Sequence, residues 1–432
     1  MPAPNTKYHV IVNPIAGTGS APTSGLINDH VCNLLESLGI PADVHVTESV
    51  KDAGRIGRDI VLERIDTPAD GVTRVVVGGG DGTAHEFIEG VLEAVKEKGV
   101  ALGKWALVTL PLGTANALHS THFPPDAAPL PIPPALAPAL GDISPQVHQA
   151  LSSLFLALSD AAPRPLPITL TSLVGRDGTV SEVVPDHIVL STSLHAAILS
   201  DSDALREQHP GLERYKLAAA QNITVFFPAE VELVPDAERG VRQYDPRTKA
   251  WVAPYTQDSE AAGSVRLKGP FTYFLSTTTT PRLEPTFVIA PTLVSLPRDE
   301  GERTMDIVIL RPLRDPAVRK AIADGSDAGV QWAARAKEVL GGAYQDGRHV
   351  GFTYGPDGGP VEDAGPGDVV VETFRAAGFV WRPTDDTHAK SHIVCADGSL
   401  YDIAKGGEAR AHVLGSEKGD RATAESGFWV WG

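Results

Sequence analysis

The chain has few cysteines, no excess of basic residues and no long hydrophobic run. Two cysteines in 432 residues, Cys32 and Cys395, cannot form a disulfide framework, and they fit a reducing compartment. Lys and Arg number 37 against 54 Asp and Glu, and the formal net charge of −17 argues against an electrostatic nucleic-acid binder. No stretch reaches the about 18–20 apolar residues that span a bilayer. These absences predict a cytoplasmic protein, and if it acts on membranes it does so from their surface.

The first 122 residues alternate short apolar runs with amphipathic segments. Strands are predicted at residues 8–12, 44–47, 74–77 and 105–110, because each is a short apolar run followed by turn residues. Apolar residues at helical spacing follow these runs, as in residues 31–38 and 88–95. This βαβα order predicts an α/β domain with a parallel sheet covered by helices.

The composition changes after residue 122. Residues 123–167 contain eleven prolines and few charges, which indicates a connector or surface insertion with one short helix at residues 145–159. From residue 168 to 432 short strands and frequent turns predict an antiparallel β-rich second domain. Its expected strands include residues 187–190, 223–227, 305–309 and 367–371.

A strand that runs into glycines carries the strongest chemical signal. It reads Val-Val-Val-Gly-Gly-Gly-Asp-Gly-Thr over residues 75–83 and is followed by an amphipathic helix. Glycines let the backbone approach a ligand, and the helix N-terminus behind them favours anions such as phosphates. Asp81 could hold Mg²⁺ or accept a proton from an attacking hydroxyl. The structural alternative is that Asp81 caps its own helix.

Two further loops follow strands of the same predicted sheet. One begins at Asn13-Pro14 and the other runs from Pro111 to Asn116. Ligands of open α/β sheets bind where the carboxyl ends of strands meet, so three such loops at one edge predict a ligand site. His119 and His122, just after the last loop, fit a polar helix face.

Three blocks resemble the signature blocks of the diacylglycerol kinase catalytic superfamily, which includes sphingoid-base kinases and bacterial lipid kinases. They are Asn13-Pro14…Gly17, Gly79-Gly80-Asp81-Gly82-Thr83…Glu86 and Pro111…Gly113-Thr114…Asn116. The resemblance covers about the first 120 residues. It implies an N-terminal fold like that of NAD kinases and diacylglycerol kinases and a β-rich lipid-binding domain over residues 168–432. NAD kinases share the glycine–aspartate block, but the other two blocks fit lipid kinases better.

The resemblance also implies roles for individual residues. Asp81 is implied as the catalytic residue, and Asp201 and Asp203 as the substrate-binding acids of the sphingoid-base branch. No metal ligand is assigned. The implied nucleotide-binding set is Asn13, Pro14, Gly17, Thr47, Gly79, Gly80, Gly82, Thr83, Glu86, Gly113, Thr114, Asn116, Lys216, Asp397, Gly398 and Ser399.

The sequence departs from the family pattern in the long segment between Asp203 and Glu213, which is an insertion, and at three sites with other residue types. The first loop, residues 13–20, lacks basic residues, Lys216 stands where an arginine is usual, and Ser399 stands where a glutamate is usual. Lys216 keeps the positive charge but not the planar fork of an arginine.

The resemblance implies an ATP- and Mg²⁺-dependent kinase that phosphorylates a lipid hydroxyl, of a sphingoid base or diacylglycerol. The implied partners are the lipid and a transient membrane surface, not nucleic acid, and the oligomeric state is left open. Two alternatives remain: a soluble NAD kinase, and a nucleotide- or lipid-binding relative that has lost catalysis. Ser399 and the uncharged first loop favour the second alternative.

Overall fold

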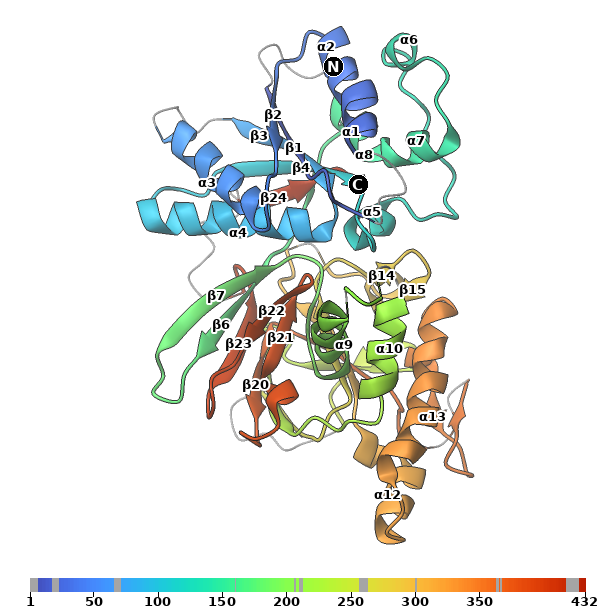
Figure 1. Ribbon diagram of the computed structural model, residues 1–432. Coiled ribbons are helices and arrows are strands. Elements are labelled where there is room, and N and C mark those ends of the chain that lie inside the picture. The colour runs from blue at the N-terminus through green and yellow to red at the C-terminus, as the bar shows by residue number, and fades with distance from the viewer. Residues whose placement is uncertain are drawn as a thin grey trace. The chain divides into compact units, whose positions relative to one another are not determined.

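The structure is a computed structural model that describes residues 7–17, 23–65, 71–159, 161–205, 207–209, 213–255, 263–299, 301–362, 365, 367–416 and 427–432. The chain divides into two compact units, Met1–Pro167 with Gly419–Gly432, and Ile168–Lys418. The predicted fold class is confirmed, because the first unit is α/β with a largely parallel sheet and the second carries antiparallel sheets (Figure 1).

A six-stranded sheet in the order β2-β1-β3-β4-β24-β5 forms the centre of the first unit. Neighbouring strands are parallel except β24 and β5, which are antiparallel. The four strands predicted in the first domain are all present. The strands of this sheet are β1 Tyr8–Val12, β2 Ala42–Val46, β3 Val72–Gly79, β4 Lys104–Pro111, β5 Arg164–Pro165 and β24 Gly427–Val430.

Strand β24 corrects the expected extent of the second domain, residues 168–432. It pairs in parallel with β4, from Gly427↔Lys104 to Val430↔Leu107, so the end of the chain completes the first sheet. Phe428 and Val430 are buried there. A local pattern shows that residues 428–431 are apolar, but it does not show which sheet they join.

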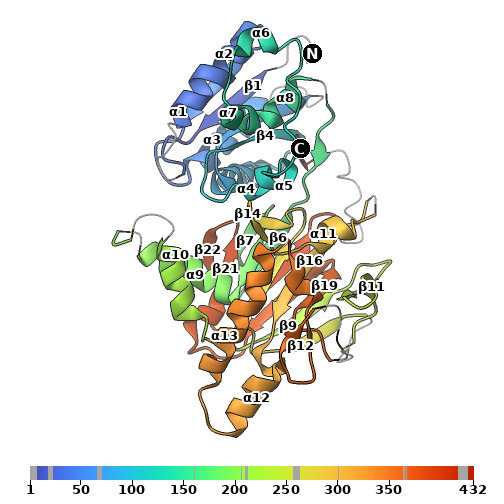
Figure 2. The same cartoon turned by 90° about the vertical axis from the view of Figure 1, so that its right-hand side faces the viewer.

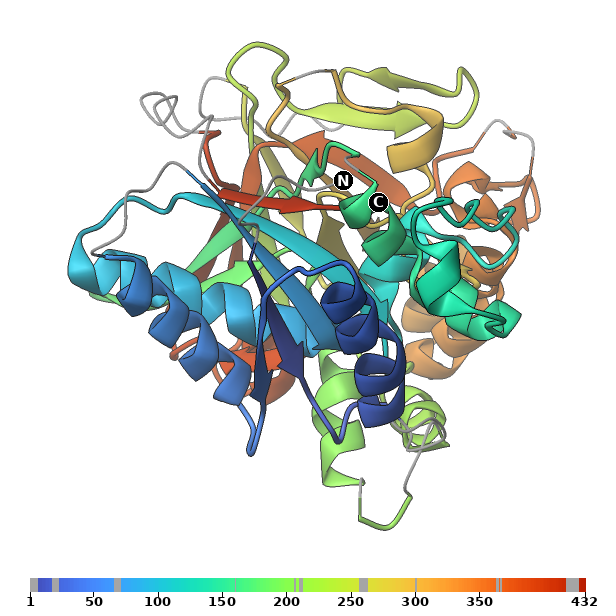
Figure 3. The same ribbon diagram turned by 90° about the horizontal axis from the view of Figure 1, so that it is seen from above.

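Helices cover both faces of this sheet (Figure 3). On one face Tyr8, Val10 and Val12 of β1 pack with the helical segment around η1, whereas α3 and α4 lie side by side on the other face. The segment η1 is a π-helical turn within an otherwise α-helical stretch. The helices are α1 Thr23–Leu26, η1 Ile27–Cys32, α2 Asn33–Ser37, α3 Asp52–Arg64, α4 Asp81–Lys98, α5 Ala117–His122, α6 Ala137–Leu140, α7 Pro145–Ala150 and α8 Ser152–Leu158.

The proline-rich segment 123–167 was expected to be a connector, but it contributes to the core. Leu140 of α6 and Leu151, Leu154 and Phe155 at α8 belong to the same buried cluster as the first sheet. The apolar spacing of residues 151–158 favours this packing, and prolines stand in the first turns of α6 and α7.

Two antiparallel sheets form the second unit, in the orders β11-β10-β19-β16-β13-β8-β21-β22 and β12-β9-β20-β23-β6-β7. One buried cluster draws on both sheets, and Phe274 of β13 lies 5.2 Å from Trp381 of β20 between ring centroids. The strands are β6 Thr169–Val174, β7 Val180–Asp186, β8 Leu190–Thr192, β9 Ala229–Val234, β10 Arg242–Asp245, β11 Ala250–Val252, β12 Val265–Lys268, β13 Tyr273–Thr277, β16 Met305–Leu310, β19 Glu372–Ala376, β20 Gly378–Pro383, β21 Ile393–Ala396, β22 Ser399–Asp402 and β23 Glu408–Val413.

Two short pairs of strands, β14-β15 and β17-β18, and several helices complete this unit. Helix α9 packs on α10, and α12 on α13 (Figure 2). None of the helices in the described ranges is long and apolar enough to cross a membrane. The elements are β14 Arg282–Glu284, β15 Phe287–Val288, β17 Thr353–Tyr354, β18 Pro360–Val361, α9 Ser193–Ala204, α10 Glu213–Asn222, α11 Thr292–Ser295, α12 Pro316–Ala323, α13 Ala328–Gly341, and the 3₁₀ turns η2 Pro312–Arg314, η3 Gly342–Tyr344, η4 Arg348–Gly351 and η5 Ala389–His392.

Some strand predictions in this unit were wrong. Residues 305–309 form β16, but residues 223–227 and 367–371 form no named strand, and β8 begins only at Leu190. Ile223 and Phe227 are buried all the same. A run of apolar residues indicates that the segment is buried. Whether the segment is a strand depends on a hydrogen-bonded partner elsewhere in the chain, which the run itself does not reveal.

Candidate functional site

The three loops leave neighbouring strands at the same edge of the first sheet. The Asn13 N–H donates to the Gly78 carbonyl at 2.8 Å, and the Leu112 N–H donates to the Gly79 carbonyl at 3.2 Å. On the other side of β1, the buried Thr47 donates its N–H to the Val12 carbonyl at 2.9 Å. The structure therefore brings the first, second and third loops together with the threonine that follows β2. Residues 18–20 of the first loop lie outside the described residues.

Glycine backbones touch where the second and third loops meet. A Cβ atom built on Gly80 would lie 2.8 Å from the Gly113 Cα, and one built on Gly113 would lie 2.5 Å from the Gly80 Cα. Gly17 has φ +79°, and a Cβ there would lie 2.6 Å from the Leu112 carbonyl oxygen. Because side chains do not fit at these positions, backbone groups line the loop contact.

Two asparagines and a threonine hold these loops in place. The Asn13 Nδ2 donates to Thr83 Oγ1 at 3.1 Å and links the first loop to the second. The Asn116 side chain accepts from the Gly113 N–H at 2.7 Å and donates to the Gly113 carbonyl at 2.9 Å. Asn116 itself has φ +51°, a conformation that asparagine tolerates. Their implied contacts with a nucleotide stay predictions, whereas their contacts with the loops are observed.

Asp81 is the first residue of α4, but it caps a different helix. Its Oδ2 accepts from the Ala117 N–H at 2.7 Å, and its Oδ1 accepts from the Leu118 N–H at 3.2 Å. Both donors belong to the first turn of α5, and Gly80 is the N-cap of α4. Both oxygens of the Asp81 carboxylate therefore hold the first turn of α5.

A small pocket of about 10 Å³ lies beside Asp81, which is room for roughly one water molecule. Asn116, Thr109 and His119 also line it. His119 was expected on a polar helix face, but it is buried, and burial lowers the pKa of His119 to about 4. Its imidazole is therefore neutral at pH 7. The sequence signal for this burial was the position of His119 directly after the apolar pair Ala117-Leu118 at the start of α5.

Glu86 lies one turn along α4 and connects that helix to the start of α3. It is half-buried, and burial raises its pKa, while backbone N–H groups of Lys51 and Ala53 oppose the rise by bonding to its carboxylate. The implied nucleotide contact of Glu86 is therefore accompanied by a structural one. Pro14 and Thr114 are exposed in their loops.

The remaining predicted residues belong to the second unit. Asp201 on α9 is held by Lys390, whose Nζ lies 2.6 Å from its Oδ2, and by Asn222, whose Nδ2 donates to the same oxygen at 2.6 Å. Asp203 and Lys216 are exposed, on α9 and α10. Asp201 thus already has a cationic partner from the protein itself.

Asp397 holds the backbone that leads into β8. Its carboxylate accepts from the N–H groups of His187, Ile188 and Val189, each at 2.9 Å. Burial and the charge of Asp397 raise the pKa of the neighbouring Asp186. These contacts explain why residues 187–189 do not join β8.

The turn between β21 and β22 contains the other two residues of this block. Asp397 and Gly398 have φ +49° and +97°, and Ser399 begins β22. The implied nucleotide roles of Asp397, Gly398 and Ser399 stay predictions.

Comparisons with known proteins place the three loops in a family. Residues 7–130 match the model of the diacylglycerol kinase catalytic domain. The Pseudomonas putida protein named "Probable lipid kinase YegS-like" is 36% identical over 128 residues, which are 29% of this chain and 37% of that protein. The alignment therefore spans little more than a third of that relative's length.

Solved structures resemble the whole chain more distantly. A Bacillus anthracis protein described as a diacylglycerol kinase is 13% identical, with 94% of each chain covered and a TM-score of 0.47. Yeast NADH kinase in complex with NADH is 11% identical, with 98% and 83% covered and a TM-score of 0.40. The likeness to the family therefore rests on the loop-bearing part of the chain, where residues 7–130 match the diacylglycerol kinase catalytic domain.

Proposed function

We propose that this protein is an ATP-dependent lipid kinase, which transfers the γ-phosphoryl group to the hydroxyl of a sphingoid base or a diacylglycerol. The observation that carries the proposal is the meeting of three glycine-containing loops at the carboxyl edge of β1, β3 and β4, within the part of the chain that matches the family. The proposal includes a cytoplasmic location and transient contact with a membrane surface, where such a lipid resides.

The residues at this edge fit a nucleotide triphosphate. Glycine backbones replace side chains at the loop contact, and the 18-residue helix α4 directs its N-terminus to the same edge. A helix N-terminus carries partial positive charge, which favours phosphate groups. When bound, Mg²⁺ would offset phosphate charge, and the carboxylate oxygens of Asp81 are ligands of the kind that Mg²⁺ prefers.

The predicted site residues then have individual roles in the proposed reaction. Asp81 orients the lipid hydroxyl or takes its proton, and Lys216 neutralises charge on the phosphoryl oxygens. Asn13 and Asn116 keep the loops at a fixed separation for the nucleotide. Asp201 or Asp203 faces the head group, and for a sphingoid base Asp201 exchanges its partner Lys390 for the amine of the lipid.

The deciding experiment measures phosphate transfer from labelled ATP to a sphingoid base, a diacylglycerol and NAD. Transfer to a lipid supports the proposal. Transfer to NAD without lipid or detergent would assign the soluble alternative. Nucleotide binding without transfer to any acceptor would assign a relative that has lost catalysis, an outcome that Ser399 and the two hydrogen bonds already accepted by Asp81 would explain.

We expect Gly82→Ala to weaken ATP binding without weakening the fold. A Cβ built on Gly82 meets no atom within 4 Å, and alanine stabilises a helix by about 0.5–1 kcal/mol relative to glycine. The methyl group would nevertheless stand between the backbone and the phosphates. Calorimetric ATP affinity and the thermal midpoint measure the two effects. Gly341→Ala in α13, whose Cβ is equally unobstructed, is the control. If Gly82→Ala binds ATP with unchanged affinity, the phosphates do not bind at this turn.

We expect Lys390→Met to increase the preference for a sphingoid base over diacylglycerol. The change removes the cation that lies 2.6 Å from Asp201 Oδ2 and leaves that carboxylate for the lipid amine. The measurement is the ratio of kcat/KM for the two lipids. Lys320→Met removes an exposed pair with Asp324 in α12 and should leave the ratio unchanged. An unchanged ratio in Lys390→Met would exclude Asp201 from the head-group site.

A further inference from the structure

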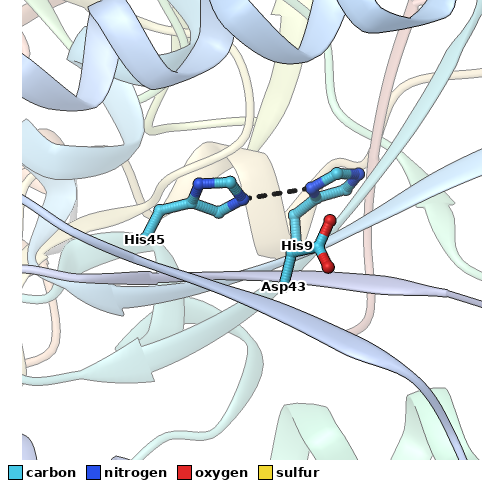
Figure 4. Close-up of side chains that lie close together, drawn as sticks. All are labelled: His9, Asp43 and His45. Carbon is cyan, nitrogen blue, oxygen red and sulfur yellow. Dashed lines mark hydrogen bonds between the residues drawn. The ribbon is translucent and has the colours of Figure 1, made fainter.

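Three side chains with metal-binding atoms converge on strands β1 and β2 (Figure 4). His9 is the register partner of Asp43, and His45 lies two residues further along β2. Because side chains alternate along a strand, Asp43 and His45 project from the same face of β2, as His9 does from β1. The ligand atoms all lie within 4.8 Å of one another, and His9 Nδ1 lies 3.2 Å from His45 Nε2.

We propose that His9, Asp43 and His45 bind one divalent transition-metal ion of the zinc class. Two imidazole nitrogens and one carboxylate oxygen are ligands that zinc uses, and three protein ligands leave a fourth position for water. Tetrahedral zinc with Zn–N bonds of about 2.0–2.1 Å places two nitrogens roughly 3.3–3.4 Å apart. The observed separation of 3.2 Å is close to this value, so the imidazoles need little rearrangement.

The two imidazoles already lie against each other. His9 is buried and His45 is partly buried, and their ring centroids are 5.5 Å apart. In the metal-free state the two nitrogens share one hydrogen bond and Lys7 pairs with Asp43. Metal binding moves the shared proton to the outer nitrogen of its ring and releases Lys7 to solvent.

Nearby charges set how strongly this cluster attracts a cation. Lys7 disfavours positive charge at both histidines, as do Arg64 at His9 and Arg55 at His45, whereas Asp43 and Glu63 favour it. The charges are therefore mixed, and selectivity must come from the imidazoles. Imidazole suits zinc, copper and nickel, whereas Mg²⁺ prefers oxygen ligands.

The position of the cluster suggests what a bound ion would do. In the described sheet β2 is an edge strand beside β1. An ion held by both strands would cross-link them, two residues before Thr47, whose N–H already bonds to Val12. The site is independent of the proposed kinase function, since its occupation needs neither nucleotide nor lipid.

The test uses the full chain, stripped with a chelator and titrated with zinc sulfate in a calorimeter. We expect one zinc ion per chain at micromolar concentrations and a higher thermal midpoint when it is bound. His9→Ala and His45→Ala should each weaken binding at least about tenfold, a loss that even outer-shell partners of a metal can cause. His30→Ala in η1 is the matched control and should bind as the wild type does. Cobalt should give the visible absorption of a tetrahedral site.

Several results would overturn the proposal. They are no saturable zinc binding by the wild type, an unaltered affinity in His45→Ala, or an equal midpoint shift with Mg²⁺. His45 is half-exposed on an edge strand, so its replacement is expected to preserve the fold, and circular dichroism checks this. If His9→Ala does not fold, the wild type and His45→Ala still decide the question.

Discussion

Asp81→Asn should lower the turnover of phosphate transfer by about 10²–10⁴-fold, the range that a positioned acid or base contributes. It should also destabilise the first unit. Both Asp81 oxygens accept from backbone N–H groups of α5, and an asparagine can accept from one of them while its NH₂ group faces the other. Ala117 and Leu118 are buried, so the unpaired N–H costs about 1–3 kcal/mol. The thermal midpoint of each variant is determined first, and turnover is then measured at a temperature well below it.

A matched variant separates the two effects. Asp315 is a buried carboxylate that caps α12, accepting from Ala317 and Val318 N–H groups and pairing with Arg335. Both N–H groups donate to the same oxygen, Oδ1, so Asp315→Asn keeps the cap but loses the pairing of Oδ2 with Arg335. It should lower stability for that reason and leave turnover intact. If Asp81→Asn is destabilised like Asp315→Asn but keeps normal turnover, Asp81 is a capping residue and the proposed chemistry lies elsewhere.

The double use of Asp81 also shows what a local motif can and cannot predict. The glycine turn, the helix after it and the three loops were predictable, because each is encoded by consecutive residues. The helix that Asp81 caps begins 36 residues later, at Ala117. From local sequence, a carboxylate at the start of a helix is expected to cap that same helix. The observed partner, α5, could therefore not be predicted.

The same limit explains the errors in the fold. The first sheet followed from short apolar runs in βαβα order, but strand β24 joins it from more than 300 residues away, at Gly427↔Lys104. The His9 and His45 cluster was missed for the same reason. His9 is one polar residue within a buried strand, and only the register of β1 against β2 brings it to His45. The hydrophobic periodicity and the composition of two strands do not determine the register in which they pair.

Gly113→Ala should reduce ATP affinity by more than about tenfold, or 1.4 kcal/mol, and lower stability as well. The new Cβ would lie 2.5 Å from the Gly80 Cα and 3.0 Å from Asn116 Oδ1, whereas carbon atoms pack at about 3.5–4.0 Å. The second and third loops would have to move apart, which costs about 1–3 kcal/mol as overpacking does. Calorimetric ATP affinity and denaturant unfolding are the measurements.

Gly80→Ala makes a double-mutant cycle possible. Its Cβ would lie 2.8 Å from the Gly113 Cα, so either substitution separates the same two loops. Once the loops have moved, the second methyl group should cost less than it does alone, and the losses in stability and in ATP affinity should both be less than additive. Strictly additive losses in ATP affinity would mean that the two glycines act on the nucleotide separately, and that their close contact is a packing feature of the fold rather than the element that positions the phosphates.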